Sequence, residues 1–355
     1  MRMGPVGNVT GSRLIPGLSG AANQNQEIQA VKVNAIRIEK QGGPEVMTLK
    51  SMDVAEPGAG EVLVRHTVIG LNFMDVYLRG GQYPLAVPSG IGCEGAGVVE
   101  AMGAGVTGLA KGDRVAYGGS APGSYADLRL MPADRLVKLP DDITEEQAAA
   151  ILMKGMTVEY MLQRCYPVKR GDFVLFHAAA GGVGLVAGQW GKALGATMIG
   201  VAGGPEKCAL AKAHGYAHVI DRKSEDIVAR VKEITGGAGV PVVYDSVGKD
   251  SFDASLKSLA PRGYFVSFGT TTGAPPPVEA AMLQKMGSLY FTRPTLATYV
   301  AKRDDLVMSA NAVFDMVRKG AVKVHIGQRY RIADAAKAHV ELEAGRTSGS
   351  SVMTP

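Results

Sequence analysis

The chain has 355 residues, of which 46% are hydrophobic and 20% charged, with a formal net charge of +5. These values are typical of a globular protein with room for two domains; no apolar run reaches membrane-span length, and no basic run indicates a nucleic-acid-binding surface. The three cysteines, Cys93, Cys165 and Cys208, lack metal-site or disulfide spacing, which argues against structural zinc and favours a reducing, cytoplasmic compartment.

The first 30 residues differ from the rest of the chain. They are rich in Gly, Asn, Gln and Ser and have no apolar signal core. We therefore predict that residues 1–30 are a flexible N-terminal extension and not a secretion signal.

Short β-like runs separated by Gly and Pro follow from residue 31 to residue 154. We expect strands at 31–39, 61–71, 95–102, 114–116, 125–130 and 135–138. A helix is expected over 142–154, with Thr144 as its N-cap and Glu145 and Glu146 in its first turn. The region is predicted to be a compact β-rich domain that ends at this helix.

The sequence FVLFHAAAGGVG at 173–184 reads as a strand, a glycine turn and then a helical pattern that starts at Leu185. Glycine lets the main chain approach a dinucleotide's pyrophosphate, and the helix start offers unpaired N–H groups. Ala178 stands where the usual fingerprint has its first glycine, and a turn made only for packing is the alternative interpretation.

Further strand-like runs at 196–202, 218–221, 240–247 and 263–269 alternate with helical patterns at 205–214 and 224–234. Such alternation is typical of an α/β fold with a doubly wound parallel sheet. We assign residues 155–294 to this dinucleotide-binding domain.

The tip of the second strand indicates which dinucleotide binds. NAD-preferring sites place a carboxylate there, whereas this chain has Gly203 and Gly204, followed by Lys207 and Arg222. A carboxylate-free pocket with two cations favours the 2′-phosphate of NADPH over NADH. The alternative is that Lys207 and Arg222 are solvated surface charges.

The remaining residues, 295–355, are too few for an independent domain. We expect a helix at 298–319, a few strand-like pieces and a loop-like end at 346–355. The segment is predicted to return to the β-rich domain and complete it, so that cofactor and substrate bind in a cleft between the two domains.

The order of these elements resembles the medium-chain dehydrogenase/reductase superfamily, and within it the zinc-free, ζ-crystallin-like NADPH:quinone oxidoreductases. The motifs that carry the resemblance include GLNFMDVYLRGGQYP at 70–84, GCEGAGVV at 92–99, KGMTVEYML at 154–162, FHAAAGGVGLVAGQW at 176–190 and VYDSVG at 243–248. The resemblance implies a GroES-like catalytic domain (31–154, completed by 295–355) and a Rossmann domain (155–294). It also implies a homodimer that pairs Rossmann sheets through an edge strand, which we place near 263–269.

No metal is expected in this branch. Zinc-dependent relatives carry a catalytic Cys where this chain reads Asn72, Phe73, Met74, Asp75, and their GHE motif reads Gly92, Cys93, Glu94. Cys93 and Glu94 alone do not supply the three protein ligands of a catalytic zinc.

The resemblance also implies the site residues. The residues nearest the reacting groups would be Asn72, Tyr77, Tyr83 and Arg293. Those that bind NADPH would be Phe73, Asp75, Thr157, Tyr160, Gly181, Gly182, Val183, Gly184, Gly203, Gly204, Lys207, Arg222, Ser246, Phe268, Gly269, Thr271, Pro294, Leu296 and Arg346.

Several of these residues have a structural alternative. Asn72 and Asp75 are also typical of a turn or a helix cap. Tyr77 and Tyr83 also suit a core with a polar edge, and Phe268 suits packing. Lys154 and Gly155 read as a helix C-terminal charge and a helix stop, and neither is assigned a role.

The resemblance implies three candidate functions. The first is metal-independent hydride transfer from NADPH to a quinone. The second is reduction of a 2-enoyl thioester or enone, with Tyr83 as the proton donor. The third is a crystallin-like structural or RNA-binding role, against which the lack of a concentrated basic face argues.

Overall fold

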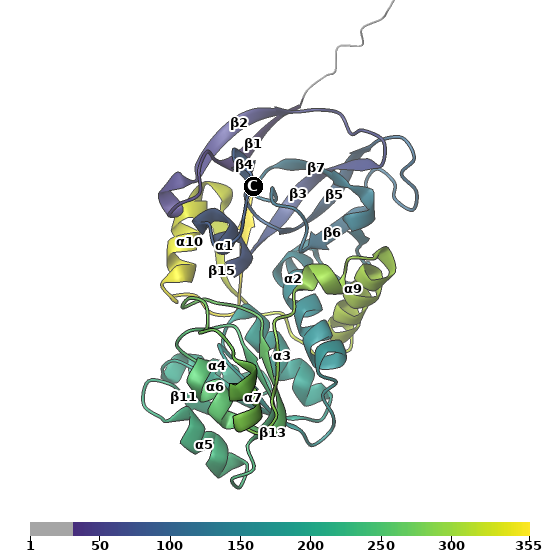
Figure 1. Cartoon of the computed structure of the whole chain (residues 1–355). Coiled ribbons are helices and arrows are strands. Elements are labelled where there is room, and N and C mark those ends of the chain that lie inside the picture. Colours follow the sequence, from purple (N-terminus) through teal and green to yellow (C-terminus); the bar gives the residue numbers. More distant parts are fainter. Residues whose placement is uncertain (1–30) are drawn as a thin grey trace, which may run out of the picture.

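The computed structural model describes residues 31–355, and the predicted extension, residues 1–30, lies outside the described residues. The described chain has two parts, a β-rich part at the top of Figure 1 and an α/β part at the bottom. Helices α2 (Glu145–Glu159) and α9 (Arg303–Arg318) lie where the two parts meet (Figure 1). The C-terminus ends in the β-rich part.

The larger sheet of the β-rich part has seven strands and joins segments that are far apart in sequence. In sheet order they are β15 (Ile326–Arg331), β16 (Ser350–Thr354), β3 (Glu61–Leu71), β5 (Glu94–Met102), β6 (Arg114–Gly118) and β8 (Val137–Lys138), with β7 (Leu128–Pro132) also paired to β3. Strand β16 is antiparallel to β3, with Val352 opposite Gly70. The C-terminal segment thus joins the sheet of the N-terminal part, while the boundaries at 154/155 and 294/295 remain predictions.

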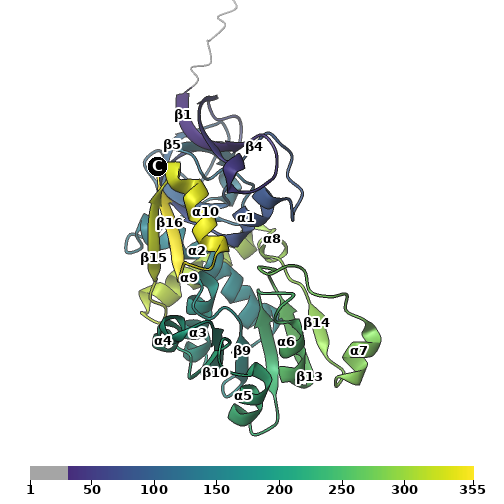
Figure 2. The same ribbon diagram turned by 90° about the vertical axis from the view of Figure 1, so that its left-hand side faces the viewer.

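A smaller, three-stranded sheet completes the β-rich part. Its order is β2 (Thr48–Val54), β1 (Val31–Ile38) and β4 (Ser89–Gly90). Helix α1 (Phe73–Gly80) follows β3 directly, and α10 (Ala335–Glu343) precedes β16. Figure 2 shows α10 beside β15 and β16, with α1 next to it.

The α/β part contains a six-stranded sheet in which every pairing is parallel. Its order is β11 (His218–Asp221), β10 (Thr197–Ala202), β9 (Phe173–Phe176), β12 (Val240–Asp245), β13 (Leu259–Ser267) and β14 (Tyr290–Thr292). The chain winds outward from β9 to one edge and then from β12 to the other. The carboxyl ends of β9 and β12 therefore form the switch point at which such sheets bind ligands.

Helices cover both faces of this sheet because its strands are apolar on both sides. Val174 and Phe176 of β9 join the core formed with α2, α3 (Gly182–Ala193) and α9, whereas Leu175 joins a core with α5 (Ile227–Ile234). The other helices are α4 (Pro205–Ala213), α6 (Phe252–Ser258), α7 (Ala280–Lys285) and α8 (Leu296–Tyr299), with 3-10 turns at 44–46, 133–135 and 332–334 and a π-helical turn at Tyr160–Cys165. The predicted doubly wound α/β fold is confirmed.

Helix α2 begins as predicted and ends later. The Thr144 side chain accepts a hydrogen bond from the Gln147 N–H at 3.1 Å, which confirms the N-cap. The helix continues through Lys154 and Gly155, so the interpretation of Gly155 as a helix stop is wrong. A Cβ at Gly155 would lie 2.6 Å from Cγ1 of Val313, because this glycine lets α9 pack closely against α2.

Other expectations about single elements are wrong in detail. Helix α3 begins at Gly182 and not at Leu185, and the helix expected at 298–319 is divided into α8 and α9. The loop expected at 346–355 contains β16, whose strand conformation depends on pairing with β3. Strand β13 covers 263–267 but is flanked by β12 and β14, so β14 forms that edge of the described sheet. Within residues 31–355, no helix combines the length and apolarity that crossing a membrane requires.

Candidate functional site

The turn between β9 and α3 is packed so closely that a side chain would collide at Gly182 and Gly184. Gly181 is the N-cap of α3, and Val183 lies half-buried in the helix's first turn. A Cβ on Gly184 would lie 2.6 Å from the Ala179 carbonyl oxygen, and one on Gly182 would lie 2.8 Å from Cδ of Lys154. These two glycines serve the close packing of the turn, and the helix N-terminus that starts there is what suits a pyrophosphate.

The C-terminal segment runs beside this turn. The Gly349 N–H donates to the Ala180 carbonyl at 2.9 Å, and Gly349 forms a parallel bridge with Gly181. Lys207 Nζ donates to the Gly345 carbonyl at 2.6 Å, and the next residue, Arg346, is exposed. Residues 345–349 thus lie between the glycine turn and the cation at Lys207.

Cations gather at the tip of β10. A Cβ on Gly203 would lie 3.2 Å from Nε of Arg222, and one on Gly204 would lie 3.6 Å from Nζ of Lys223. Burial lowers the pKa of Lys207 most, and the nearby charges of Arg222 and Lys223 lower it further. Three positive groups therefore share a small region in which an anion would relieve their repulsion.

Asp221, at the end of β11, organises this tip. Its Oδ1 accepts hydrogen bonds from the N–H groups of Gly204 at 2.9 Å and Lys223 at 3.0 Å, and these bonds lower its pKa. The carboxylate thus holds the two loops together, which places the side chain of Lys223 next to Gly204.

Helix α1 brings aromatic side chains against the α/β part. The Tyr77 hydroxyl accepts a hydrogen bond from the Thr270 N–H at 3.0 Å, and the rings of Tyr77 and Tyr83 lie 5.7 Å apart. Arg293 donates to the Tyr83 hydroxyl at 3.3 Å and to the Ser267 hydroxyl at 3.2 Å. The structure therefore brings together three of the four residues predicted nearest the chemistry.

The fourth, Asn72, lies at the start of α1. Its Nδ2 donates to Oε2 of Glu94 at 2.8 Å, and the same oxygen accepts from Nζ of Lys154 at 2.9 Å. Oε1 of Glu94 accepts from the Met153 N–H at 2.7 Å. Asn72 is thus fixed by a buried ion pair that the sequence did not reveal.

The other predicted cofactor residues lie on loops and helices, with Phe73 at the start of α1 and Thr157 in the last turn of α2. Phe73 packs on Tyr77 with ring centroids 5.9 Å apart, and the half-buried Thr157 donates to the Met153 carbonyl at 2.8 Å. Phe268 packs on Phe176. The Thr271 N–H donates to the Ser246 carbonyl oxygen at 3.1 Å, and a Cβ on Gly269 would lie 2.7 Å from that oxygen. Pro294 is half-buried and Leu296 buried.

Two predicted cofactor residues have other roles in this structure. Asp75 is fully buried, and its Oδ2 accepts hydrogen bonds from the Asn72 N–H at 2.9 Å and the Tyr125 hydroxyl at 2.9 Å. The bond to Asn72 is the helix-cap role that the sequence offers as the alternative to cofactor binding. Tyr160 is 2% exposed and stacks on Tyr299 with ring centroids 4.3 Å apart. The side chains of both residues are occupied inside the protein.

Proteins with similar sequences are known for both parts of the chain. The family described as alcohol dehydrogenase GroES-like domain matches residues 58–141, and that described as zinc-binding dehydrogenase matches residues 182–305. The chain is 49% identical to a quinone oxidoreductase of Pseudomonas aeruginosa, over 88% of this chain and 97% of that protein. The chain belongs to the quinone oxidoreductase family.

Two further relatives bear on ligand and chemistry. The crystal structure of Escherichia coli quinone oxidoreductase complexed with NADPH has a TM-score of 0.89 at 45% identity, over 91% of this chain and 100% of that one. A 2-haloacrylate reductase of a Burkholderia species is 40% identical, over 91% of this chain and 99% of that protein.

In this quinone oxidoreductase family member, sequence reasoning missed Lys223, Thr270 and the Glu94–Lys154 pair. In the sequence, Glu94 stands out only as part of an incomplete zinc motif, and Lys154 only as a charge near an expected helix end. Lys223 adjoins Arg222 and was detectable as a third cation. The partners Glu94 and Lys154 are 60 residues apart, and no local pattern connects them.

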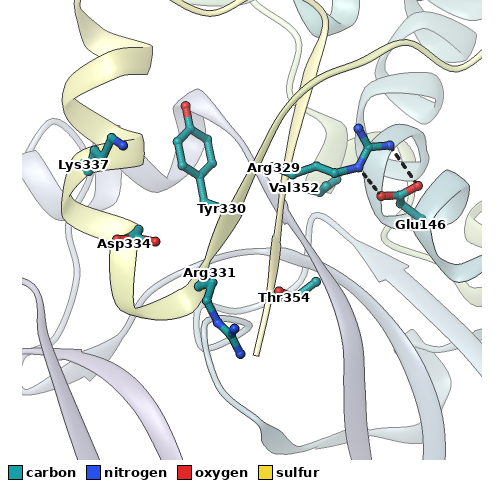
Figure 3. A pocket seen from close by; sticks show the side chains of 8 residues that line it. All are labelled: Glu146, Arg329, Tyr330, Arg331, Asp334, Lys337, Val352 and Thr354. Carbon is teal, nitrogen blue, oxygen red and sulfur yellow. Dashed lines mark hydrogen bonds and ion pairs between the residues drawn. The ribbon is translucent and has the colours of Figure 1, made fainter.

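Two further features of this family member concern metal binding and a pocket away from the predicted site. Across residues 31–355, no group of three His, Cys, Asp or Glu side chains is arranged to hold a metal ion. Figure 3 shows a pocket between β15, β16 and α10, in which Arg329 pairs with Glu146 at 2.7 Å. None of the residues lining that pocket belongs to the predicted site.

Proposed function

We propose that the protein is an NADPH-dependent, metal-independent quinone oxidoreductase. The observation that carries the proposal is the tip of β10, which has no carboxylate of its own and lies near Lys207, Arg222 and Lys223, in a chain 49% identical to a quinone oxidoreductase. A 2′-phosphate is the group that distinguishes NADPH from NADH, and it is a dianion that suits this tip.

The residues present fit NADPH. Gly182 and Gly184 let the turn pack against Lys154 and Ala179, and the first N–H groups of α3 at this turn would bind the pyrophosphate. Gly203 and Gly204, with the three cations, would hold the 2′-phosphate. Ser246, Gly269 and Thr271 would line the remaining edge with main-chain and hydroxyl groups. When bound, NADPH supplies the hydride from its nicotinamide ring.

The chain's own residues would orient the acceptor and stabilise charge on it. The half-buried ring of Tyr83 would contact a flat quinone, and the buried Tyr77 would support it from behind. The Arg293 guanidinium would stabilise negative charge that develops on an acceptor oxygen. Because the Tyr83 oxygen accepts from Arg293, its own O–H proton is available for donation.

A stopped-flow screen tests this function. NADPH oxidation is followed with 1,4-benzoquinone, 9,10-phenanthrenequinone and a crotonyl thioester, and each reaction is repeated with NADH. We expect quinone turnover with NADPH to exceed that with NADH and that with the thioester. A thioester turned over much faster than both quinones would contradict the proposal.

An enone reductase is the second candidate, favoured by the 40% identity to a 2-haloacrylate reductase and by the hydrogen-bonded Tyr83. In that reaction Tyr83 would donate a proton to carbon, for which a phenol held in place is needed. Tyr83→Phe is then expected to abolish thioester reduction nearly completely and to leave quinone turnover within a few-fold. Equal losses in both reactions would exclude this division of roles.

We further propose a cytoplasmic homodimer. The support is the family's implied edge-strand pairing and the presence of β14 at one edge of the described parallel sheet. A nucleic-acid-binding role is not proposed, and a gel shift in about 150 mM salt, with and without NADPH, checks that expectation.

A further inference from the structure

We propose that Glu94 and Lys154 are positioning residues that set the orientation of the Asn72 amide and fix the glycine turn against the β-rich part. The inference rests on the proposed function, because Asn72 and the turn are its expected NADPH contacts. Neither residue touches the ligand in this proposal; both act through Asn72 and Gly182.

The Glu94–Lys154 pair is buried, and both oxygens of Glu94 accept hydrogen bonds. The side chains of Glu94 and Lys154 are 0% and 6% exposed, and their charged atoms lie 2.9 Å apart. Burying two charges carries a large desolvation cost, and such a pair often adds little to stability. A role in arranging neighbouring groups accounts for its presence at the junction of the two parts.

The hydrogen bonds of Glu94 dictate which way the Asn72 amide faces. Oε2 is a carboxylate oxygen and only accepts, so it requires Nδ2, and not Oδ1, of Asn72 at 2.8 Å. Oε1 is already bound to the Met153 N–H. The Asn72 carbonyl is thereby turned away from Glu94, and the amide is held in one of its two orientations.

Lys154 connects the same carboxylate to the glycine turn. Its ammonium binds Glu94 on β5, while its stem lies against Gly182, where a Cβ would be 2.8 Å from Cδ and 3.0 Å from Cε. One side chain thus spans from a strand of the β-rich part to the first residue of α3. This contact sets the distance between Asn72 and the turn.

Glu94→Gln tests the orientation. If the new amide keeps its oxygen toward the Met153 N–H, its NH₂ group faces two donors, Asn72 Nδ2 and Lys154 Nζ. Asn72 must then reverse its amide. We expect the NADPH dissociation constant, measured by fluorescence titration, to rise about tenfold. Glu100→Gln is the matched control, since Glu100 forms an exposed ion pair with Arg65 on the same strand.

A double-mutant cycle separates positioning from general loss of stability. In an Asn72→Ala background, Glu94→Gln is expected to change NADPH affinity by clearly less than about tenfold, because no amide is left to orient and only the contact of Lys154 with Gly182 can still be disturbed. A merely structural pair would lower the melting temperature and change affinity by the same factor in both backgrounds. Equal factors, or no change in either, overturn the proposal.

A charge-neutral variant covers the case in which the single substitution does not fold. Glu94→Gln combined with Lys154→Met removes both buried charges, so the ligand-free protein is expected to melt close to the wild type. Its NADPH affinity is expected to stay about tenfold weaker, since the reversed amide remains. Wild-type affinity in this variant overturns the positioning role. Failure of the wild type to bind NADPH overturns the proposed function itself.

Discussion

Single residues in and near the site carry unusual conformations or protonation. Ala178 stands at the first glycine position of the fingerprint and has a φ of 54°, in the left-handed region that disfavours a side chain. Asp75 is fully buried among Asn72, Tyr125, Cys93 and Glu94, and burial raises its pKa to about 7. Both features allow direct tests.

Ala178→Gly is expected to stabilise the protein. Removing the Cβ relieves the left-handed strain, and the gain is partly offset by the greater freedom of glycine in the unfolded chain, which leaves about 0.5–1 kcal/mol. Thermal or urea unfolding measures the change. A clearly less stable variant would show that the Ala178 methyl makes contacts worth more than the strain.

Asp75→Asn is expected to make stability less dependent on pH. Because the pKa of Asp75 rises from 3.8 to about 7 on folding, the folded state binds the proton more tightly. The stability from this group is fully present below about pH 3.8 and is lost as pH rises to about 7. Relative to wild type, the variant's melting temperature should therefore rise between pH 4 and pH 7 and then level off.

The difference in melting temperature between the wild type and Asp75→Asn cancels the contribution of every other titrating group, because both proteins contain those groups. Burial lowers the pKa of His66 to about 4, so that residue loses stabilising effect as pH falls, in both proteins alike. A difference in melting temperature that stays constant from pH 4 to pH 8 would contradict the raised pKa of Asp75.

At the scale of elements, the loops after β10 and β11 form the part of the site that selects the cofactor. Asp221 joins them through Gly204 and Lys223, and Lys207 reaches across to the C-terminal segment at Gly345. The glycines and two of the cations were predictable because they are local to strand ends. The Lys207–Gly345 contact was not, because it joins residues 138 positions apart.

Replacing both Lys207 and Arg222 with Ala is expected to weaken NADPH binding by about 10- to 100-fold and to leave NADH binding within about twofold. Adding Lys223→Ala should weaken NADPH binding further. Fluorescence titration with each dinucleotide gives the two affinities. Lys232→Ala, an exposed lysine on α5, is the control. If NADH affinity fell by the same factor as NADPH affinity, these cations would not be the groups that recognise the 2′-phosphate.

At the scale of the whole molecule, the sheet of the α/β part ends at a strand suited to pairing. Strand β14 is the edge next to β13, and Tyr290 on it is 53% exposed and stacked on Tyr264 with centroids 4.5 Å apart. An edge strand presents unpaired backbone groups that a second copy can pair with.

Tyr290→Lys is expected to weaken the proposed dimer, because a charge on an edge strand opposes strand pairing. Size-exclusion chromatography with light scattering should give twice the chain mass for the wild type and a concentration-dependent fall for the variant. Lys257→Ala on α6 controls for surface change. A monomeric wild type, or a variant that stays fully dimeric, would exclude β14 as the interface.

The sequence alone determined the fold class, the glycine turn, Lys207 after β10 and Arg222 after β11. Each of these depends on residues that are close together in the chain, where strand, turn and helix preferences are readable. The tertiary structure decided what joins distant residues. Lys154 meets Glu94 across 60 positions and Thr270 meets Tyr77 across 193. The strand conformation of 350–354 likewise depends on β3. Hydrogen bonds between such segments form only after the chain has folded, so no local pattern encodes them.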